Sequence, residues 1–465
     1  MTILMKLDEK SGSSIPNNIN YFETELTNVA IDKTYEREFI TLNPINEAPH
    51  QFIVLSGASY IDPSKTRVVT TWNLKKREKG KTEWVNVVAE DNVNVVNGLG
   101  AAFPKNLKIM ANGMQMFNSN NFYSYLAHFM HELRYAEDAK KSSMNAFGYY
   151  YENEVKDYEV KDADAVGTAG TSGYKPAVVA KYNKTEAWKE RRDLFTDGKF
   201  AEFSAPLYAD IFMQPMLLPS NMELDFEFIP QQSNFLIVAP TIDTTKWDVS
   251  LKMHSIRLFV TFVDLHPNVA LEIEKRLATE PMKISVKRTE LRNLIFDQQR
   301  LENHSTAFTD FVPREMDLAF IPRDNFVGTV NTDPFYCDHA NLSELQATAT
   351  TNNVPFVPFI MDFDKNRYVR AFEHLHRTIG LSENAIDCGI NRKMFGKGYT
   401  IFPFKLTPSQ EDHGGFDFIQ QGPTTFKTKH KKEIPFGGMY VVLVGFFDSI
   451  MYIDLSRTIR TDLNM

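Results

Sequence analysis

The sequence has 465 residues, more than one hydrophobic core usually serves, and this length predicts two domains or three. Hydrophobic residues make up 43% and charged residues 24%, as in ordinary globular proteins, while the 12% of aromatic residues favours a β-rich fold. The net charge of −8 argues against a dedicated nucleic-acid-binding protein, and no apolar run is long enough to cross a membrane. The two cysteines, Cys337 and Cys388, make no disulfide framework, and the N-terminus lacks the apolar core of a signal peptide. We therefore expect a soluble protein made inside the cell.

Short strands dominate the beginning of the chain. Residues 1–48 are polar and mixed, and we interpret them as an extended N-terminal arm. Alternating β-branched and apolar residues then predict strands over 51–56, 66–74 and 83–90. The basic run 75–81 is interpreted as a solvated hairpin loop, with a nucleic-acid patch as the weaker alternative.

The dipeptide Asn112-Gly113 predicts a β-hairpin over 107–117. A type I′ turn needs positive φ at both central residues, and Asn-Gly supplies it at the least steric cost. We interpret these two residues as a structural turn.

A helix is expected over 121–135, where apolar residues recur at helical spacing. His128, His131 and Glu132 lie on it, but their order does not match the His-Glu-x-x-His pattern of zinc proteases. We expect surface histidines or histidines with hydrogen-bond partners.

The tract 140–195 is the most irregular part of the sequence, and we interpret its acidic and glycine-rich middle, 150–185, as a long exposed loop. Calcium binding by its carboxylates is the alternative, although the EF-hand spacing is absent. The carboxylates in question are Asp157, Glu159, Asp162 and Asp164.

The remaining elements repeat this plan. Further strands are expected over 198–212, 221–230 and 247–265, followed by a helix at 267–281 that begins at Pro267. In the second half we expect strands over 282–296, 315–321, 342–350, 399–406, 424–432 and 438–455, and a helix over 365–379 that ends at Gly380. Many short strands with turn signals predict sandwiches or barrels, so we expect two all-β units of about 200 residues joined by the helix at 267–281.

Two patterns with chemical connotations have simpler interpretations. Gly396-Lys397-Gly398 resembles a phosphate-binding loop, but the residues that follow form a strand pattern with a proline rather than the helix that such a loop needs. His374-Leu-His376 resembles the metal-binding pair of cupins, but two residues apart on a helix is about 200° of rotation. We expect the glycines at 396–398 to form a turn into a strand, and we expect no metal site at His374 and His376.

The order of these segments resembles the double jelly-roll major capsid proteins of Maverick/Polinton elements and adintoviruses, relatives of adenovirus hexon and virophage capsid proteins. The similarity covers nearly the whole chain from about residue 50 and is most specific in the last third. It is carried by the segments 103–117, 205–229, 368–380, 397–408, 416–427 and 441–457.

The resemblance implies a specific architecture and function. It implies an all-β chain of two antiparallel eight-stranded jelly rolls, with the arm 1–48, the first jelly roll at 49–266, the linker helix at 267–281 and the second jelly roll with its tail at 282–465. Three chains would form a pseudo-hexagonal capsomer, and capsomers an icosahedral shell around a DNA genome. It implies a virion protein that is made in the host cytoplasm and partners with itself and with a single jelly-roll penton protein. It implies no catalytic residue. From the residues themselves we expect no cofactor, no metal, no sequence-specific nucleic acid and no membrane span.

Two alternatives remain open at the level of sequence. Glu223-Leu-Asp225-Phe-Glu227 matches the E-x-D-x-E strand motif of family 16 glycoside hydrolases, which are also jelly rolls. Retaining hydrolases need two carboxyl groups about 5–5.5 Å apart. The outer glutamates of a regular strand lie about 13 Å apart, so only a bulge could bring them together. The other alternative is a non-viral jelly-roll binding protein, which no motif in the sequence supports.

Overall fold

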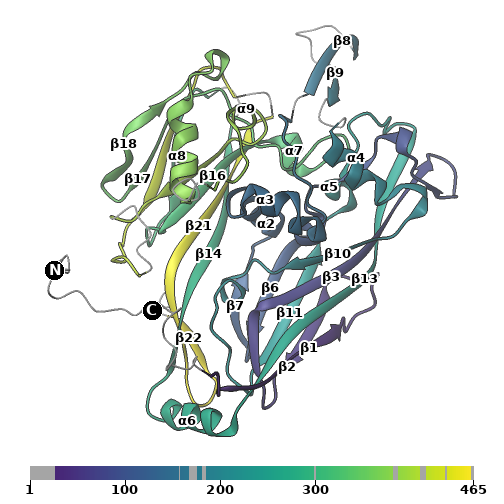
Figure 1. The fold of residues 1–465 in the computed structure, drawn as a ribbon. Coiled ribbons are helices and arrows are strands. Elements are labelled where there is room, and N and C mark those ends of the chain that lie inside the picture. Colours follow the sequence, from purple (N-terminus) through teal and green to yellow (C-terminus); the bar gives the residue numbers. More distant parts are fainter. Residues whose placement is uncertain are drawn as a thin grey trace, which may run out of the picture.

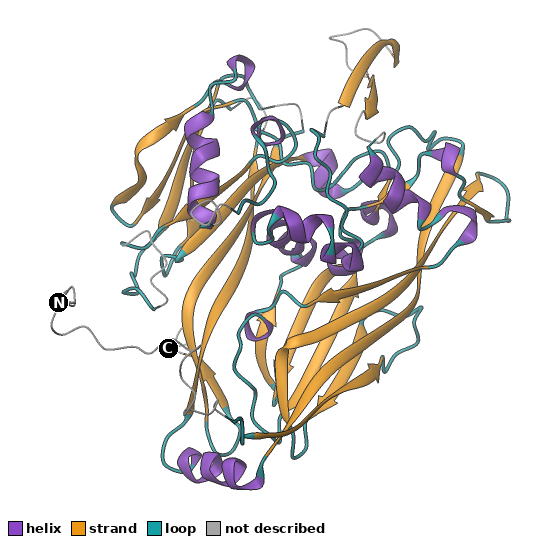
Figure 2. Ribbon diagram, viewed as in Figure 1, coloured by secondary structure: helices purple, strands orange, loops and turns teal. Residues whose placement is uncertain are grey.

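The structure is a computed structural model of the chain and describes residues 27–156, 158–166, 175–180, 185–297, 300–380, 386–408, 415–434 and 437–461. Within these ranges β-sheet dominates and the helices are short (Figure 2). Two β-sandwiches stand side by side, one built before residue 266 and the other after residue 281 (Figure 1).

The first sandwich has two principal antiparallel sheets, with strand orders β1–β13–β3–β10 and β2–β11–β6–β7. Short strands β4 and β5 and the hairpin β8–β9 lie outside these two paths. The strands are β1 (Ile31–Ile40), β2 (His50–Leu55), β3 (Tyr60–Glu78), β4 (Val85–Asn86), β5 (Asn94–Val95), β6 (Pro104–Ala111), β7 (Met114–Asn118), β8 (Tyr158–Val166), β9 (Lys175–Ala180), β10 (Ala201–Pro206), β11 (Glu223–Pro230), β12 (Ile237–Val238) and β13 (Trp247–Leu265).

The second sandwich repeats the arrangement, with strand orders β14–β21–β16–β19 and β15–β20–β17–β18. Each unit has eight strands in its two main sheets, and we number them here from first to eighth along the chain. In both units one sheet has the order first, eighth, third, sixth, and the other has the order second, seventh, fourth, fifth. This is the strand order of a jelly roll, occurring twice. The strands are β14 (Met282–Phe296), β15 (Glu302–Phe308), β16 (Glu315–Pro322), β17 (Leu342–Ala349), β18 (Asn352–Ile360), β19 (Ile401–Lys405), β20 (Thr424–His430), β21 (Met439–Ile453) and β22 (Ile459–Thr461).

Helices occupy the connections. Two of them, α2 and α8, follow the fifth principal strand of their units, and α6 joins the two units. Pro267 is the first residue of α6, and Gly380 ends α8 with a φ of 72°. The helices are α1 (Leu99–Ala102), α2 (Tyr123–Leu133), α3 (Glu137–Lys141), α4 (Glu186–Asp193), α5 (Ser233–Leu236), α6 (Pro267–Leu277), α7 (Arg323–Val327), α8 (Val369–Ile379) and α9 (Arg392–Phe395).

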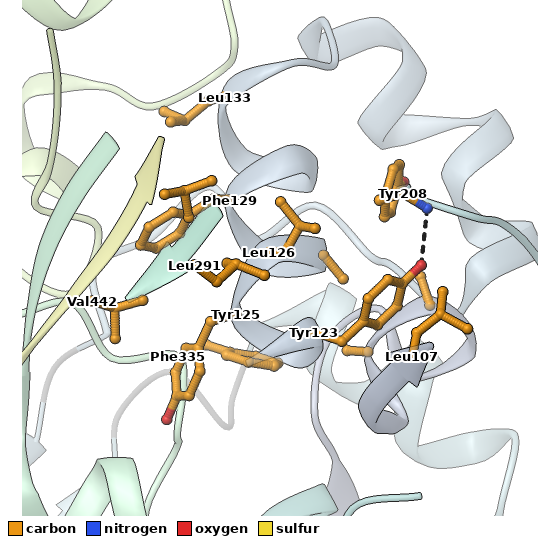
Figure 3. Close-up of a cluster of buried hydrophobic side chains, with 14 of the residues drawn as sticks. Leu107, Tyr123, Tyr125, Leu126, Phe129, Leu133, Tyr208, Leu291, Phe335 and Val442 are labelled. Carbon is orange, nitrogen blue, oxygen red and sulfur yellow. Dashed lines mark hydrogen bonds between the residues drawn. The ribbon is translucent and has the colours of Figure 1, made fainter. Parts of the chain in front are cut away.

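Helix α2 lies at the junction between the sandwiches, and almost all of its side chains are buried. Leu126 and Phe129 of this helix belong to a cluster that includes Leu291 and Val442 of the second unit (Figure 3). In the same cluster the backbone N–H of Tyr208 donates to the Tyr123 hydroxyl at 2.9 Å. The two sandwiches therefore share one continuous core across α2.

Several local predictions were wrong, and for β1 and β3 the pairing with the distant strand β13 decided the outcome. The arm predicted at 1–48 includes β1, which pairs with β13 along its length although most of its side chains are exposed. The run 75–81 is not a loop throughout, because β3 continues to Glu78. The strand predicted at 83–90 shrinks to the two residues of β4.

Other strands gave no clear pattern in the sequence. The tract predicted as a loop at 150–185 contains the hairpin β8–β9. The side chains considered as alternative calcium ligands, Asp157, Glu159, Asp162 and Asp164, lie outside the described part of the chain. Strand β18 carries Pro355 and Pro358, which suit an edge strand because one side of its backbone needs no ladder partner.

Candidate functional site

The acidic strand β11 is regular. Its carboxylates Glu223, Asp225 and Glu227 alternate with the buried side chains of Leu224 and Phe226. Its ladders with β2 and β6 are in register through these residues, without the bulge that could gather the carboxylates. Asp225 and Glu227 line a hollow of about 230 Å³, which Gln51, Lys108 and several apolar side chains also line.

The glycines of the candidate phosphate loop follow a helix instead of preceding one. Helix α9 ends at Gly396, and β19 starts soon after Gly398. A Cβ at Gly398 would lie 2.6 Å from the Cβ of Lys156, so this glycine permits close packing between the two units. The segment is a turn into a strand.

The Asn112-Gly113 turn has the expected backbone, with φ of 48° and 77°. It also makes a contact that the sequence did not indicate. The Asn112 side chain donates to the carbonyl of Arg457 at 2.7 Å and accepts from the backbone N–H of Glu223 at 2.8 Å. The turn therefore joins the first jelly roll to the end of the second.

The two histidines of α8 do not converge. The His374 ring faces Phe359 at 5.0 Å, whereas Nε2 of His376 lies 3.0 Å from the carbonyl of Ile390. No cluster of three or more metal-ligating side chains occurs in the part of the chain that the structure describes.

The prediction of surface or hydrogen-bonded histidines on α2 was wrong. His128 and His131 are both buried, and His131 has no hydrogen-bond partner for either ring nitrogen among the described residues. Aromatic rings surround it, with those of Tyr149 and Tyr208 each 5.5 Å away. Burial lowers the pKa of His131 to about 3, so the ring is neutral.

Charged groups are buried around α2, which the composition did not reveal. The Lys140 ammonium donates to the Glu132 carboxylate at 3.1 Å and to the carbonyl of Cys388 at 2.7 Å. Lys156 pairs with Asp333 at 2.9 Å. Both lysines come from the irregular tract and their partners include the second unit, so this insertion helps to hold the two units together.

A second group of ion pairs joins the units at the C-terminus of α2. Arg134 lies 2.7 Å from Glu315 and 3.1 Å from Asp317, both on β16. Burial raises the pKa of Asp317 to about 7 even though Arg134 favours its charged form. Nearby, Asp210 accepts from the backbone N–H of Thr289 at 3.0 Å, and burial raises its pKa to about 7.

The cysteines and the basic clusters show no chemical activation. Both cysteines are free and buried, and burial raises the pKa of the Cys337 thiol to about 12. In the basic run 427–432, Lys429 pairs with Glu344 at 3.0 Å and Lys431 with Asp362 at 3.0 Å. These are the neutralised side chains of a solvated surface.

Large apolar side chains are exposed on the strands and loops of the second unit. Phe418 is 92% exposed, and Phe356 on the edge strand β18 is 85% exposed. On the first unit, Ile53 and Leu55 project from the edge strand β2. Exposed apolar residues gathered on edge strands are typical of surfaces that contact other protein chains.

Comparisons with known proteins agree with this architecture. No family model matches the sequence. An uncharacterized protein of Caenorhabditis elegans is 25% identical over 418 residues, which cover 88% of this chain and 92% of that protein. A chain in the cryo-EM structure of the Sputnik virophage has a TM-score of 0.58 at 11% identity, covering 99% of this chain and 93% of that one.

Two further solved structures are similar to this chain over nearly its whole length. A chain of the PBCV-1 virus capsid has a TM-score of 0.56 at 8% identity, with coverage of 95% and 99%. The Faustovirus major capsid protein has a TM-score of 0.55 at 8% identity, with coverage of 93% and 92%. The chain has the double jelly-roll fold. At these identities the likeness concerns the fold, and it extends over nearly the whole length of both proteins. None of the described helices has the length and hydropathy of a membrane span.

Proposed function

We propose that this chain is a major capsid protein, which forms pseudo-hexagonal homotrimers that assemble into an icosahedral shell around a DNA genome. The observation that carries the proposal is the pair of jelly rolls with one strand order, standing side by side and tied by a shared core. Viral capsid chains have the same fold over nearly their whole length. Three such chains would place six jelly rolls in a pseudo-hexagonal ring, and units of this shape can pack into a curved lattice.

The surface chemistry supports self-association. The exposed residues Phe356, Ile360 and Phe418 would gain by burial in contacts between chains, since interface cores are enriched in aromatic residues. The net charge of −8 leaves DNA neutralisation to other proteins or ions. The fivefold positions of a closed shell need a separate protein, because a pseudo-hexagonal trimer cannot fill them; a single jelly-roll penton protein would suit. The chain would act in the virion, after synthesis in the host cytoplasm.

The resemblance to capsid proteins of Maverick/Polinton elements and adintoviruses supports a source in such an element. A relative in Caenorhabditis elegans is consistent with this origin, because an integrated element places a capsid gene in an animal genome. The glycoside hydrolase alternative loses its support, since Glu223 and Glu227 stand on a regular ladder.

The decisive experiment measures the mass of the purified full-length protein. We expect mass photometry and sedimentation to show a species of three chain masses at low micromolar concentration and moderate salt, because apolar contacts are not screened. Negative-stain images of the same sample should show pseudo-hexagonal particles. Monomers under all salt, pH and divalent-ion conditions would contradict the proposal, and so would hydrolysis of a β-glucan by the pure protein.

A further inference from the structure

The contact between the two jelly rolls of one chain has a direction, because the units contribute different surfaces to it (Figure 1). The first unit contributes the side that carries β7, the turn Asp210–Phe212 and α2. We call this the helix side of a unit. The second unit contributes the sheet that begins with β14, and a groove of about 410 Å³ lies between β7 and β14.

Helix α2 packs on the outer face of the sheet β14–β21–β16–β19. Phe320 of β16 points into the second sandwich, where its ring lies 6.2 Å from that of His430 on the opposite sheet. Asp317 stands three residues before Phe320 on the same strand, so its side chain points outward. Arg134, at the end of α2, binds Asp317 there at 3.1 Å. We call this outer face the sheet face of a unit.

Each unit has both surfaces, and the junction uses only one of each. In the second unit the helix side consists of β18 and α8, which follow the same order as β7 and α2 in the first. In the first unit the sheet face is that of β1–β13–β3–β10. Large apolar side chains are exposed on both, with Phe356 85% exposed on β18 and Ile40 72% exposed on β1.

The sheet face of the first unit is acidic. Arg257 of β13 lies 3.5 Å from Glu38 on β1 and 3.2 Å from Glu202 on β10, so these three side chains share one face. Glu36 stands two residues before Glu38 and lies on the same face, as the ladder also places Arg67. Three glutamates and two arginines give this face a net charge of −1.

The helix side of the second unit is basic. The Arg370 guanidinium donates to the carbonyls of Val357 and Pro358 at 2.7 and 2.8 Å, and these bonds tie α8 to β18. A hollow of about 250 Å³ lies beside them. The charged side chains that line it are Arg370, Arg377, Lys405 and Glu373, with a net charge of +2.

We propose that the helix side of the second unit binds the sheet face of the first unit in a second copy of this chain. The inference rests on the proposed homotrimer and assigns its contact surfaces. The second copy repeats the step that the two units of one chain already make. Phe356 and Ile360 then meet Ile40, and the basic groups around α8 meet the glutamates of the sheet face. Because the two surfaces differ, the contact is heterologous, and three copies close a ring.

The first test places a charge at the centre of each surface. We expect Phe356→Asp and Ile40→Asp each to turn the full-length protein from a trimer into a monomer at low micromolar concentration, as measured by sedimentation. Leu271→Asp is the matched control, because Leu271 is also exposed but lies on α6, outside both surfaces. It should stay trimeric, and circular dichroism checks that all three variants fold.

The second test identifies which surfaces meet. A bis-maleimide with a flexible spacer should link the double variant Ile40→Cys/Phe356→Cys into covalent trimers on a denaturing gel. Each single variant should give only single chains, because a heterologous contact never brings two copies of one surface together. The wild type is the control, since its two cysteines, Cys337 and Cys388, are buried.

Two outcomes would overturn the inference and leave the proposed function standing. One is a trimer that persists in both Phe356→Asp and Ile40→Asp. The other is a covalent dimer from Phe356→Cys alone, which would show that two β18 strands face each other. A wild-type protein that stays monomeric would contradict the proposed function and this inference together.

Discussion

Asp210 and His131 show how single buried side chains at the junction respond to pH in opposite directions. The pKa of Asp210 is raised to about 7 and that of His131 is lowered to about 3, in both cases chiefly because burial disfavours the charged form. A raised carboxyl pKa gives stability that is complete below about pH 4 and lost as the pH rises toward 7. A lowered histidine pKa gives stability that is present above about pH 6.5 and lost as the pH falls toward 3.

Replacing Asp210 with asparagine should remove the loss of stability that Asp210 causes as the pH rises toward 7. The amide oxygen of the new side chain can still accept from the Thr289 N–H, and the amide carries no charge to desolvate. We expect Asp210→Asn to be more stable than the wild type by about 2 kcal/mol at pH 8, with the difference shrinking as the pH falls to 4. Urea unfolding across this pH range checks it, and a difference that is constant with pH would show that Asp210 titrates normally.

Replacing His131 with phenylalanine should remove the loss of stability that His131 causes as the pH falls toward 3. The ring site is aromatic on several sides and offers the His131 nitrogens no partner among the described residues, so a phenyl ring suits it. We expect His131→Phe to exceed the wild type in unfolding free energy by about 2 kcal/mol at pH 5, and by less at pH 8. Equal acid sensitivity of the two proteins would contradict this reasoning.

At the scale of the element, local patterns predicted strands and helices well wherever one face is buried. Alternation on β11 and the helical stripe of α2 are strong because each element sends a regular row of apolar side chains into the core. Strand β1 gave no such signal, because it joins the sheet at an edge through its backbone and leaves most side chains in water. Edge strands whose side chains are mostly exposed, such as β1, are therefore the elements that sequence periodicity misses.

The β6–β7 hairpin offers a test at this scale. A larger side chain would have space at Gly113, since nothing lies within 4 Å of a Cβ built there. The backbone conformation is what restricts this position, because its φ is 77°. We expect Gly113→Val to lower the free energy of unfolding by about 2 kcal/mol, because a β-branched residue resists positive φ. Gly415→Val is the matched control, as its site is equally open without a positive φ, and calorimetry should show almost no change in its Tm. Similar losses in both variants would refute the turn argument.

At the scale of the whole molecule, the buried ion pairs decide whether the two jelly rolls behave as one unit. Arg134 on the first unit reaches Glu315 and Asp317 on the second, and its guanidinium also lies 5.1 Å from the Phe446 ring. We expect the wild type to unfold in one cooperative transition, because the units share this network and the core across α2.

Removing the arginine should expose that coupling. Arg134→Met leaves two carboxylates buried without their cation, and we expect the free energy of unfolding to fall by about 3 kcal/mol at pH 7.5. Arg276→Met removes an exposed pair and should cost less than about 0.5 kcal/mol. Guanidinium unfolding followed by both circular dichroism and tryptophan fluorescence measures both quantities. An Arg134→Met protein as stable as the control would show that the network does not couple the units.

The sequence by itself determined the β-rich class, the repeated plan of strands and one helix, the Asn112-Gly113 turn and the strand after Gly398. Each depends on interactions within a few residues, namely side-chain alternation, helical spacing and the φ that a turn requires. Only the tertiary structure decided the pairing of β1, the burial of His131 and the contacts of Arg134 with β16. These depend on residues far apart in the chain, whose approach is fixed by packing and not by local pattern. The groove between β7 and β14 belongs to the same class, because its lining residues come from two sandwiches that are far apart in the sequence.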